Sequence, residues 1–344
     1  MEWITLTAEQ FDEFSEKHPL NSIFQTSAWA KLKSNWEAHY VGVKDNDELK
    51  AAALVLIREV KLGYKFAYCP RGPLLDYEDE ETRTFFFSNL KTYLRKHKVL
   101  LGKCDPHIVI EEVPFGEKER INDVKNDKFV ADMHKSGAYH TGYVLKIKDS
   151  IQPRIQLNYP ITEVFDERIP KKTMKKVRAS YNKGVVIKEE HTAASLAEMV
   201  RYTENRHGIM LRNETYFTNI MEAFGDNAAV LAAYAEDKLI SACLLVSSAN
   251  TTEILYSGYM DEYKHYNSTY PLRYEAIKWA SEHGKANFNF GGVEGTMDDG
   301  LTMFKSSFDP LIDVYVGEFD ILPYPLLSTI VSKSFNLLKS KMNV

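Results

Sequence analysis

A run of positive charge is the strongest chemical signal in the sequence. Eight basic residues fall within positions 168–188 of a chain whose formal net charge is −5. A helix that begins at Pro170 would bring five of them within an arc of roughly 160° and leave Met174, Val177 and Tyr181 to dock on a core. The five are Lys171, Lys172, Lys175, Lys176 and Arg178. Such a stripe is typical of a surface that follows the phosphates of a nucleic acid, and the alternative is an ordinary solvated helix face.

Two other segments carry candidate anion ligands. Arg212 follows a helix end near Gly208, and loops that join helices carry function more often than their surroundings do. Its guanidinium could hold a diphosphate or a carboxylate through two hydrogen bonds, whereas the simpler interpretation is a surface arginine. Lys31 stands between Trp29 and Trp36 on an expected helix, where an anion ligand and an exposed lysine agree equally well with the sequence.

Other residues could accept a proton or let a ligand come close to the backbone. Asp105 ends an expected strand just before Pro106, so it could accept a proton or serve as a turn residue. Gly291 and Gly292 follow another expected strand and would let a backbone or a ligand come close. That segment is too short to be identified as a nucleotide-binding fingerprint.

Several familiar motifs are absent from the sequence. It contains no GxGxxG, no Walker loop, no HExxH, no GxSxG, no zinc-spaced Cys/His cluster and no glycine-rich pyrophosphate turn. We therefore expect neither a cofactor nor a metal. The three cysteines, Cys69, Cys104 and Cys243, are sparse and odd in number, which favours reduced thiols and a cytoplasmic location. The sequence has no signal peptide and no uncharged apolar stretch of 18 residues, so no integral membrane segment is expected.

Length and periodicity predict a mixed α/β protein with two domains. At 344 residues the chain is longer than a domain with one ordinary hydrophobic core. Thr7 and Gln10 form a capping box, and 80–98 has a helical pattern. The second half, after a boundary loop at 148–153, is expected to hold helices at 192–207, 216–224 and 272–283 and strands at 228–236, 239–247, 252–260 and 287–290. That order is the one expected of a GNAT-like acyltransferase domain, and the two halves could be two such domains in tandem.

The tail at 324–341 has the pattern of an amphipathic helix. Its apolar residues could touch a membrane, flanked by lysines, or pack on the first domain, and we favour packing. The apolar residues are Leu326, Leu327, Ile330 and Leu337, and the lysines are Lys333, Lys339 and Lys341.

The order of short motifs along the chain resembles the Fem family of peptidoglycan bridge-forming aminoacyltransferases. The matching motifs run from residue 24 to about 320, and their order and spacing are specific although no single motif is. They are 24–31 (FQTSAWAK), 68–73 (YCPRGP), Asp105-Pro106, Arg206-His207-Gly208, Arg212, Tyr216-Phe217, Tyr256-Ser257-Gly258, 289–292 (NFGG) and Phe304-Lys305.

This resemblance implies an architecture and a pair of substrates. It implies two tandem GNAT-like domains, the first built from 1–148 plus 318–344 and binding the peptidoglycan precursor, the second from 149–317 on the aminoacyl-tRNA side. An amino acid (Ala, Ser or Gly) would move from aminoacyl-tRNA to the ε-amino group of the stem-peptide lysine, or to a residue already added there. The precursor would be UDP-MurNAc-pentapeptide or its lipid-linked form. Without a coiled-coil arm, the chain looks closer to the short members that act on the UDP-linked precursor, as a monomer in the cytoplasm or peripherally at the inner face of the membrane.

The resemblance also implies roles for particular residues. Lys305, beside Phe304, would stabilise the transition state at the tRNA end, and Asp105 falls on the family's Asp-Pro as a site position. The precursor would be bound by Lys31, Arg212, Tyr216 and Tyr256. Three other functions share parts of this pattern: a GNAT enzyme that uses acyl-CoA, a non-catalytic binder of tRNA or of a nucleotide sugar, and a transferase that acts on protein N-termini.

Overall fold

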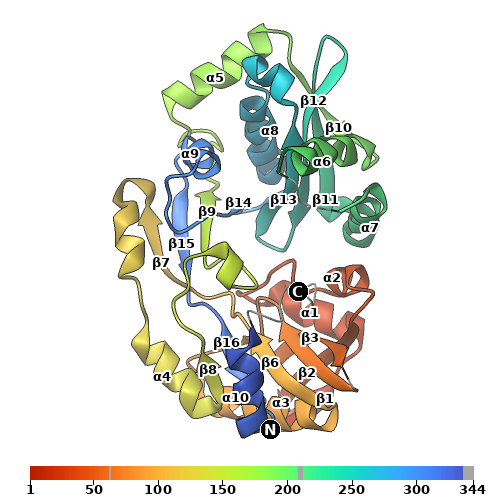
Figure 1. The fold of residues 1–344 in the computed structure, drawn as a ribbon, viewed down its shortest axis with the longest axis vertical. Coiled ribbons are helices and arrows are strands. Elements are labelled where there is room, and N and C mark those ends of the chain that lie inside the picture. Colours follow the sequence, from red (N-terminus) through yellow and green to blue (C-terminus); the bar gives the residue numbers. More distant parts are fainter. Residues whose placement is uncertain (62, 208–211, 336–344) are drawn as a thin grey trace.

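Two mixed β-sheets, one in each half of an elongated molecule, organise the fold of this computed structural model (Figure 1). The structure describes residues 1–61, 63–207 and 212–335. The sheet in the lower half has the strand order β1-β2-β3-β4-β6-β16-β8, with β5 paired to β3. The sheet in the upper half has the order β10-β11-β12-β13-β14-β9-β15-β7.

The lower half contains the beginning and the end of the described chain. Its strands are β1 (Glu2–Thr5), β2 (Glu37–Asp45), β3 (Glu48–Lys61), β4 (Tyr64–Cys69), β5 (Leu74–Leu75), β6 (Val99–Cys104), β8 (Ala138–His140) and β16 (Phe319–Ile321). Its helices are α1 (Ala8–Lys17), α2 (Ser27–Leu32), α3 (Glu80–Lys96), α4 (Asp127–Ser136) and α10 (Pro325–Lys333).

The upper half is built from the middle of the sequence. Its strands are β7 (Val109–Pro114), β9 (Ile155–Pro160), β10 (Val186–Glu190), β11 (Ala228–Ala235), β12 (Lys238–Ser247), β13 (Thr251–Tyr259), β14 (Asn287–Gly292) and β15 (Leu311–Tyr315). Its helices are α5 (Lys171–Asn182), α6 (Ala194–His207), α7 (Glu214–Phe224), α8 (Thr269–Glu282) and α9 (Gly300–Ser306).

The chain crosses between the two sheets, so a strand's position in the sequence does not by itself say which sheet it joins. β16 belongs to the C-terminal segment 318–344, and it pairs with β6 and β8 of the lower sheet. β7 falls within residues 1–148, yet it pairs with β15 in the upper sheet. The strand order therefore ties the two halves together at β7 and β16.

Local sequence signals explain several of these elements. Thr7 Oγ1 accepts a hydrogen bond from Gln10 N at 3.2 Å and Gln10 Oε1 accepts one from Thr7 N at 3.0 Å, which confirms the capping box. The apolar run 51–57 is buried on both faces of the sheet, because alternate residues enter different hydrophobic clusters. The predicted helix at 80–98 is α3, capped by Asp79 and ending at Lys96.

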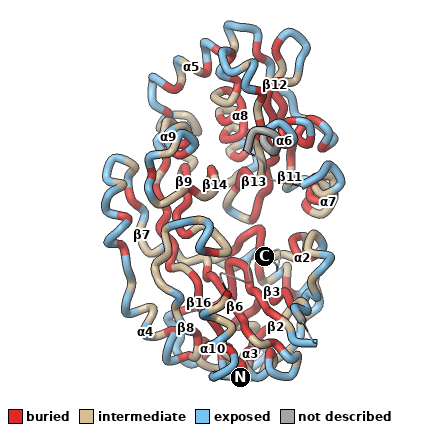
Figure 2. Tube along the Cα trace, viewed as in Figure 1, coloured by how far each residue is buried: buried red, intermediate tan, exposed pale blue. Residues whose placement is uncertain are grey.

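The core is continuous between the two halves. One hydrophobic cluster contains Trp29 of α2 and Leu54 of β3 from the lower half together with Phe217 of α7 and Leu244 of β12 from the upper half. Figure 2 shows the buried residues concentrated in the strands of both sheets, while the helices keep an exposed outer side. This shared packing holds α2 and α7 against each other at the junction of the halves.

The predicted tail helix is shorter within the described residues than the sequence pattern suggested. It is α10, Pro325–Lys333, and the predicted residues Leu337, Lys339 and Lys341 lie outside the described residues. The expected packing of the tail's apolar residues on the first domain is wrong for Leu326, Leu327 and Ile330, which are exposed, because α10 packs on the lower half through Val331 instead. Its other side is exposed.

Candidate functional site

The junction of the two halves gathers most of the sequence-predicted anion ligands. Arg212 lies with its guanidinium carbon 5.0 Å from the ring centroid of Tyr216, and the ring of Tyr216 meets that of Tyr256 edge-on at 6.2 Å. Asn213 caps α7 by accepting a hydrogen bond from Tyr216 N at 3.0 Å, which fixes Tyr216 in the first turn. Arg212, Tyr216 and Tyr256 therefore form one group, with Arg212 exposed and available to an anionic ligand.

A lysine that the sequence analysis did not single out lies where the charge of this group acts on it. Lys31 is exposed on α2, and its charge acts on Glu9 of α1. Lys33 is half-buried, with its ammonium 4.8 Å from the ring centroid of Trp29. Burial, and next the charge of Arg212, lower the pKa of Lys33 to about 8. Lys33 was not singled out in the sequence, because a helical pattern does not show which of two nearby lysines turns toward a helix of the other half.

Lys305 lies in a buried site at the end of β14. It is 7% exposed on the short helix α9, which Asp299 caps, and its ammonium donates a hydrogen bond to Gly292 O at 2.9 Å. Among the described residues no carboxylate forms an ion pair with it. Burial, and next the charge of Arg273, lower the pKa of Lys305 to about 7. A lysine in such a site is poised between its charged and neutral forms near neutral pH.

Arg273 is a second buried cation beside Lys305. It is 5% exposed on α8, and its guanidinium donates a hydrogen bond to Ser257 Oγ at 2.9 Å. Its guanidinium carbon lies 6.0 Å from the ring centroid of Phe304. Among the described residues no carboxylate pairs with Arg273. A buried arginine in that state is costly, so its position next to Lys305 indicates a role in setting the charge of that site.

Phe304 connects the Lys305 site to the basic helix α5. Its ring meets that of Tyr270 edge-on at 5.1 Å, and Tyr270 OH accepts a hydrogen bond from Lys176 of α5 at 2.6 Å. Lys176 is thus turned inward. The other predicted members of the basic stripe, Lys171, Lys172, Lys175 and Arg178, are exposed. On the opposite face of α5, Thr173, Val177 and Ser180 are buried, while Met174 and Tyr181 are half-buried.

Asp105 is buried at the end of β6 and holds the β4–β5 loop. Its Oδ1 accepts hydrogen bonds from Tyr68 OH at 2.8 Å and from Arg71 N at 2.9 Å, while its Oδ2 lies 3.6 Å from the Arg71 guanidinium. Burial raises the pKa of Asp105 to about 7, against the opposing charge of Arg71. Its Oδ2 has no hydrogen-bond partner. The Asp105 carboxyl therefore fixes the β4–β5 loop through Oδ1 and still has an oxygen, Oδ2, that could accept a further hydrogen bond.

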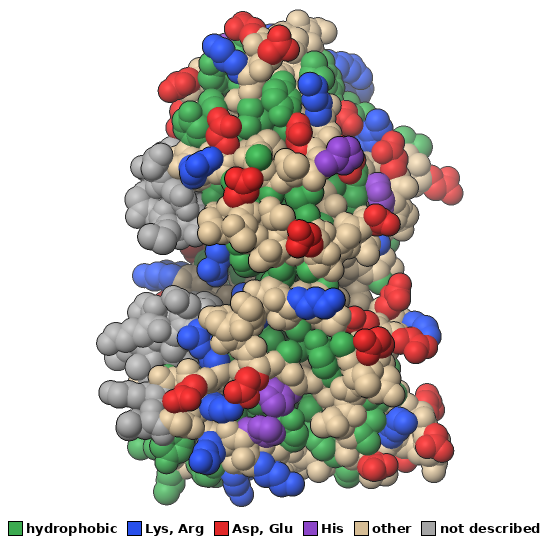
Figure 3. Space-filling model, turned by 90° about the vertical axis from the view of Figure 1, so that its right-hand side faces the viewer, with side chains coloured by type: hydrophobic (Ala, Val, Ile, Leu, Met, Phe, Trp, Pro, Cys, Tyr) green, Lys and Arg blue, Asp and Glu red, His purple; other side chains and the backbone are tan. Residues whose placement is uncertain are grey.

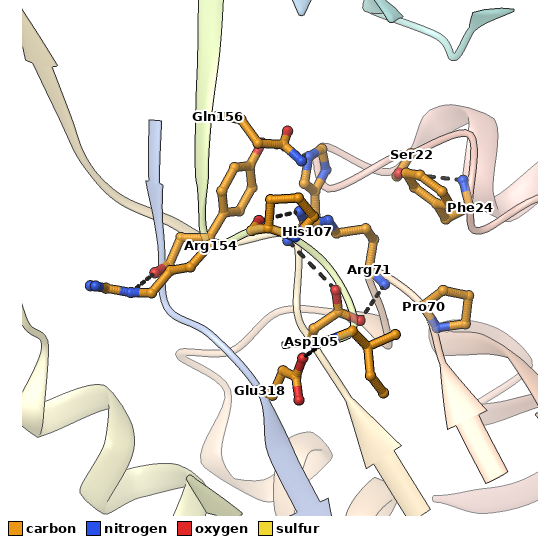
Figure 4. Close-up of polar contacts among 12 residues, drawn as sticks. Ser22, Phe24, Pro70, Arg71, Asp105, His107, Arg154, Gln156 and Glu318 are labelled. Atoms are coloured by element: carbon orange, nitrogen blue, oxygen red, sulfur yellow. Dashed lines mark hydrogen bonds and ion pairs between the residues drawn. The ribbon is translucent and has the colours of Figure 1, made fainter. Parts of the chain in front are cut away.

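Arg71 and Glu318 complete this cluster, and the sequence did not single them out. Arg71 has a left-handed backbone, with φ 51°, which a non-glycine residue adopts where its surroundings hold it there. Its guanidinium donates to Pro153 O at 2.9 Å and lies 4.3 Å from the ring centroid of Tyr315. Figure 4 shows Arg71, Asp105 and Glu318 converging from the β4–β5 loop, β6 and the start of β16. Arg71 lies within the Cys-Pro-Arg-Gly-Pro motif, and that motif is the feature of the sequence that could have identified it as a site residue.

The Lys305 site and the Asp105 cluster belong to one region. A side chain at Gly292, the acceptor of the Lys305 hydrogen bond, would collide with Pro153, and Pro153 O in turn accepts from Arg71. A small pocket lies at the Asp105 cluster, lined by Arg71, Asp105, Glu318 and neighbouring residues. Figure 3 shows Lys and Arg side chains along the waist between the two halves. The arrangement offers cations, a carboxyl near its titration point and a tight backbone within one region, which suits acyl transfer to an amine.

Two further features of the described residues concern metal binding and membrane crossing. Within the part of the chain that the structure describes, no group of His, Cys, Asp and Glu is placed to hold a metal ion. None of the described helices is both long and apolar enough to cross a membrane.

Comparison with known proteins defines the class first. A tandem GNAT protein from the clavulanic acid biosynthesis pathway superposes with a TM-score of 0.53 at 10% identity, over 94% of this chain and 99% of that one. A crystal structure of FemX superposes with a TM-score of 0.83 at 23% identity, over 96% of this chain and all of FemX. The fold is therefore a pair of GNAT-like domains.

Sequence comparison then identifies the family. The FemAB family model matches residues 6–238 and 230–333, and the chain belongs to the FemAB family. A UDP-N-acetylmuramoylpentapeptide-lysine N(6)-alanyltransferase of Weissella viridescens is 28% identical over 324 residues, covering 91% of this chain and 92% of that protein. A lipid II:glycine glycyltransferase of Staphylococcus epidermidis is 24% identical over 422 residues, covering all of this chain and 98% of that protein. The protein is an aminoacyltransferase.

Proposed function

We propose that this enzyme builds the interpeptide bridge of peptidoglycan by moving an amino acid from aminoacyl-tRNA to the ε-amino group of the stem-peptide lysine. The observation that carries the proposal is the junction region, where Lys305 is linked to the Asp105 carboxyl through Gly292, Pro153 and Arg71, and a separate cationic group surrounds Arg212. Family membership and the names of its relatives support the substrates.

The two substrates are assigned to opposite sides of the junction. The precursor lies between the first domain, 1–148 plus 318–344, and α7 of the second. Its phosphates or carboxylates are on Lys31 or Lys33 of the first domain and on Arg212, Tyr216 and Tyr256 of the second. The tRNA lies against the second domain, 149–317, with its backbone on the exposed face of α5. Its aminoacyl end would reach Phe304 and Lys305 past Tyr270, which contacts both α5 and α9.

The chemistry needs no covalent enzyme intermediate. The donor is an activated ester. The acceptor amine attacks its carbonyl carbon, an amide bond forms, and the ester bond breaks so that the tRNA leaves with a free, protonated hydroxyl. Positioning of the two substrates supplies several kcal/mol, and one cation or donor at the developing oxyanion supplies about 3–4 kcal/mol. Lys305 is assigned to the oxyanion. Asp105, whose pKa of about 7 allows it to be ionised at neutral pH, is assigned to the proton that leaves the amine.

The acceptor is proposed to be the soluble, UDP-linked precursor of the cytoplasm, used by a monomer. The alignment with the glycyltransferase extends over 422 residues, more than the 344 of this chain, so that relative carries residues that this chain lacks. The alignment with the alanyltransferase spans 324 residues and nearly all of both proteins. The size of the chain thus favours the relative whose name contains the UDP-linked acceptor.

The test combines purified protein, UDP-MurNAc-pentapeptide and tRNA charged separately with alanine, serine or glycine, with the product weighed by mass spectrometry. A gain of one residue is expected from one of the three donors. A gain seen only with lipid-linked precursor would reject the soluble acceptor. No gain with either acceptor would reject the proposal, and acetyl transfer from acetyl-CoA would favour an ordinary GNAT activity.

A further inference from the structure

Helix α10 has its polarity reversed relative to an ordinary surface helix. Its inward side carries Ser328, which is fully buried, and Ser332, whose hydroxyl bonds to Asp320. Its outward side carries Leu326, 87% exposed, and Ile330, 64% exposed, with Leu327 beside them at 42%. A surface helix in a globular protein normally buries its leucines and exposes its serines. The exposed apolar side of α10 therefore indicates an interaction surface.

The way α10 is anchored explains why the apolar side remains outside. Ser328 Oγ accepts a hydrogen bond from Tyr324 N at 3.0 Å, and Val331 packs against the cluster that contains Phe66 and Leu101. These contacts orient the helix on the sheet. Leu326 and Ile330, four residues apart, then share the opposite face, where Lys333 follows one turn later.

Basic residues adjoin the start of this exposed helix. Arg95 at the end of α3 donates two hydrogen bonds to Pro323 O, at 3.0 and 2.6 Å, so the exposed residues Arg95, Lys96 and Lys98 adjoin the start of α10. The described residues 322–335 contain one lysine, Lys333, and neither aspartate nor glutamate, in a chain whose net charge is −5. The nearby Asp320 is buried and bonded to Lys103. The charge of the face is therefore opposite to that of the molecule.

Further apolar residues lie at the same end of the sheet. Tyr64 and Val60 are 43% and 45% exposed near the turn between β3 and β4. Lys65 N donates to Lys98 O at 3.1 Å, which places this turn next to the end of α3. Figure 3 shows hydrophobic and basic side chains together at the lower end of the molecule. An apolar strip with a basic border is the pattern of a helix that lies in the interface of an anionic bilayer.

We propose that the outward face of α10, with the cations at the end of α3, docks the enzyme on an anionic lipid surface. Leu326, Leu327 and Ile330 would enter the headgroup region, while Lys96, Lys98 and Lys333 would meet lipid phosphates. The contact would be peripheral and reversible, because three apolar side chains and a few charges supply far less affinity than a spanning helix. It goes beyond the proposed function, which needs only a soluble acceptor, and it places the lipid contact on the half of the molecule assigned to that acceptor.

Co-sedimentation of the purified protein with lipid vesicles tests this proposal. The vesicles are phosphatidylcholine alone, or phosphatidylcholine and phosphatidylglycerol in equal parts. Binding is expected on the mixed vesicles, weaker in high salt and absent on phosphatidylcholine alone. No donor or acceptor is present, so a failure here is distinct from a failure of transfer, which is assayed separately with the soluble precursor.

Matched variants separate the apolar and the charged contributions. Leu326→Asp with Ile330→Asp is expected to lower the partition coefficient about tenfold or more, and so is Lys96→Glu with Lys333→Glu. Val164→Asp is the control, since Val164 is 55% exposed in a loop of the upper half, and it should bind as the parent does. All five side chains are exposed, so melting temperatures should stay close to that of the parent.

Three outcomes would overturn the proposal. The first is a parent protein that does not distinguish the two kinds of vesicle, or an Asp variant that binds as well as the parent. The second is a parent dimer that the Asp variant converts to monomer, which would make the face an interface between two copies. The third is a rise in vesicle binding when the chain is ended at Phe335, because the last nine residues would then be what covers this face. The proposal instead expects binding to fall on this truncation, since two positive charges, Lys339 and Lys341, are lost.

Discussion

At the scale of single residues, Lys305 is the most informative position. It combines burial, a single hydrogen bond to a backbone carbonyl and a pKa of about 7. Structural lysines seldom meet these three conditions together, because an uncompensated buried ammonium is costly.

Replacing Lys305 by alanine tests its assignment to the oxyanion. We expect kcat to fall by roughly 10²–10³ with little change in KM, because the interaction is made mainly in the transition state. Steady-state kinetics with both substrates give the measurement. Lys278→Ala, a partly exposed lysine on α8, should leave kcat unchanged. A Lys305→Ala variant with the kcat of the parent would remove the residue from the mechanism.

The neighbouring Arg273 should set the pH range in which Lys305 works. Only the charged form of Lys305 stabilises an oxyanion, so kcat should fall as pH rises through about 7. Removing a nearby positive charge favours the charged form, so Arg273→Met should move this fall to higher pH. The pH dependence of kcat is the measurement. A fall at an unchanged pH would mean that Arg273 has only a structural role.

At the scale of elements, α5 combines a docking face and an exposed basic face. The side chains of Lys171, Lys172 and Lys175 are exposed, whereas Lys176 is bonded to Tyr270. The helix therefore has fewer free cations than its sequence suggests, and its buried face connects to Phe304 through Tyr270.

Charge reversal on α5 tests the proposed tRNA contact. Lys171→Glu, Lys172→Glu and Lys175→Glu together should weaken tRNA binding and flatten its dependence on salt, because fewer counterions are released from the phosphates. Binding is measured over a range of salt concentrations. The control reverses Lys128 and Lys135, exposed lysines of α4. Equal salt slopes for the parent and the triple variant would rule α5 out.

At the scale of the whole molecule, buried acids gather around the junction. Burial raises the pKa values of Asp105 at the end of β6, Glu253 on β13 and Asp313 on β15 to about 7, and the charge of Arg71 opposes each shift. Arg71, from the lower half, thus lies close to acids of both sheets. The junction is an electrostatic contact as well as an apolar one.

These acids should make the stability of the protein fall as pH rises. Between the unfolded pKa of about 4 and the folded pKa of about 7, the folded chain binds more protons, so the free energy of unfolding should fall by about 1.4 kcal/mol per pH unit for each such acid. Glu253→Gln should make the decline shallower. Urea unfolding between pH 5 and pH 7 measures both. The same slope in parent and variant would show that Glu253 keeps an ordinary pKa when folded.

The sequence determined those features that depend on neighbours along the chain. The Thr7 capping box, the start of α3 and the buried run in β3 follow from local patterns, and the structure confirms them. The spaced motifs also indicated the Fem family and two GNAT-like domains, which the comparisons confirm. Local hydrogen bonds and hydrophobic periodicity act over a few residues, so a sequence displays them directly.

Only the tertiary structure decided which residues meet at the junction. The charge of Arg212 acts on Lys33, because α2 packs against α7 of the other half. Arg71 reaches Asp105 and Pro153 across separations of 34 and 82 residues. The outward turn of Leu326 on α10 likewise depends on the sheet beneath it. Such contacts arise from packing between distant segments, and no local pattern in the chain encodes which side of a helix the rest of the molecule will cover.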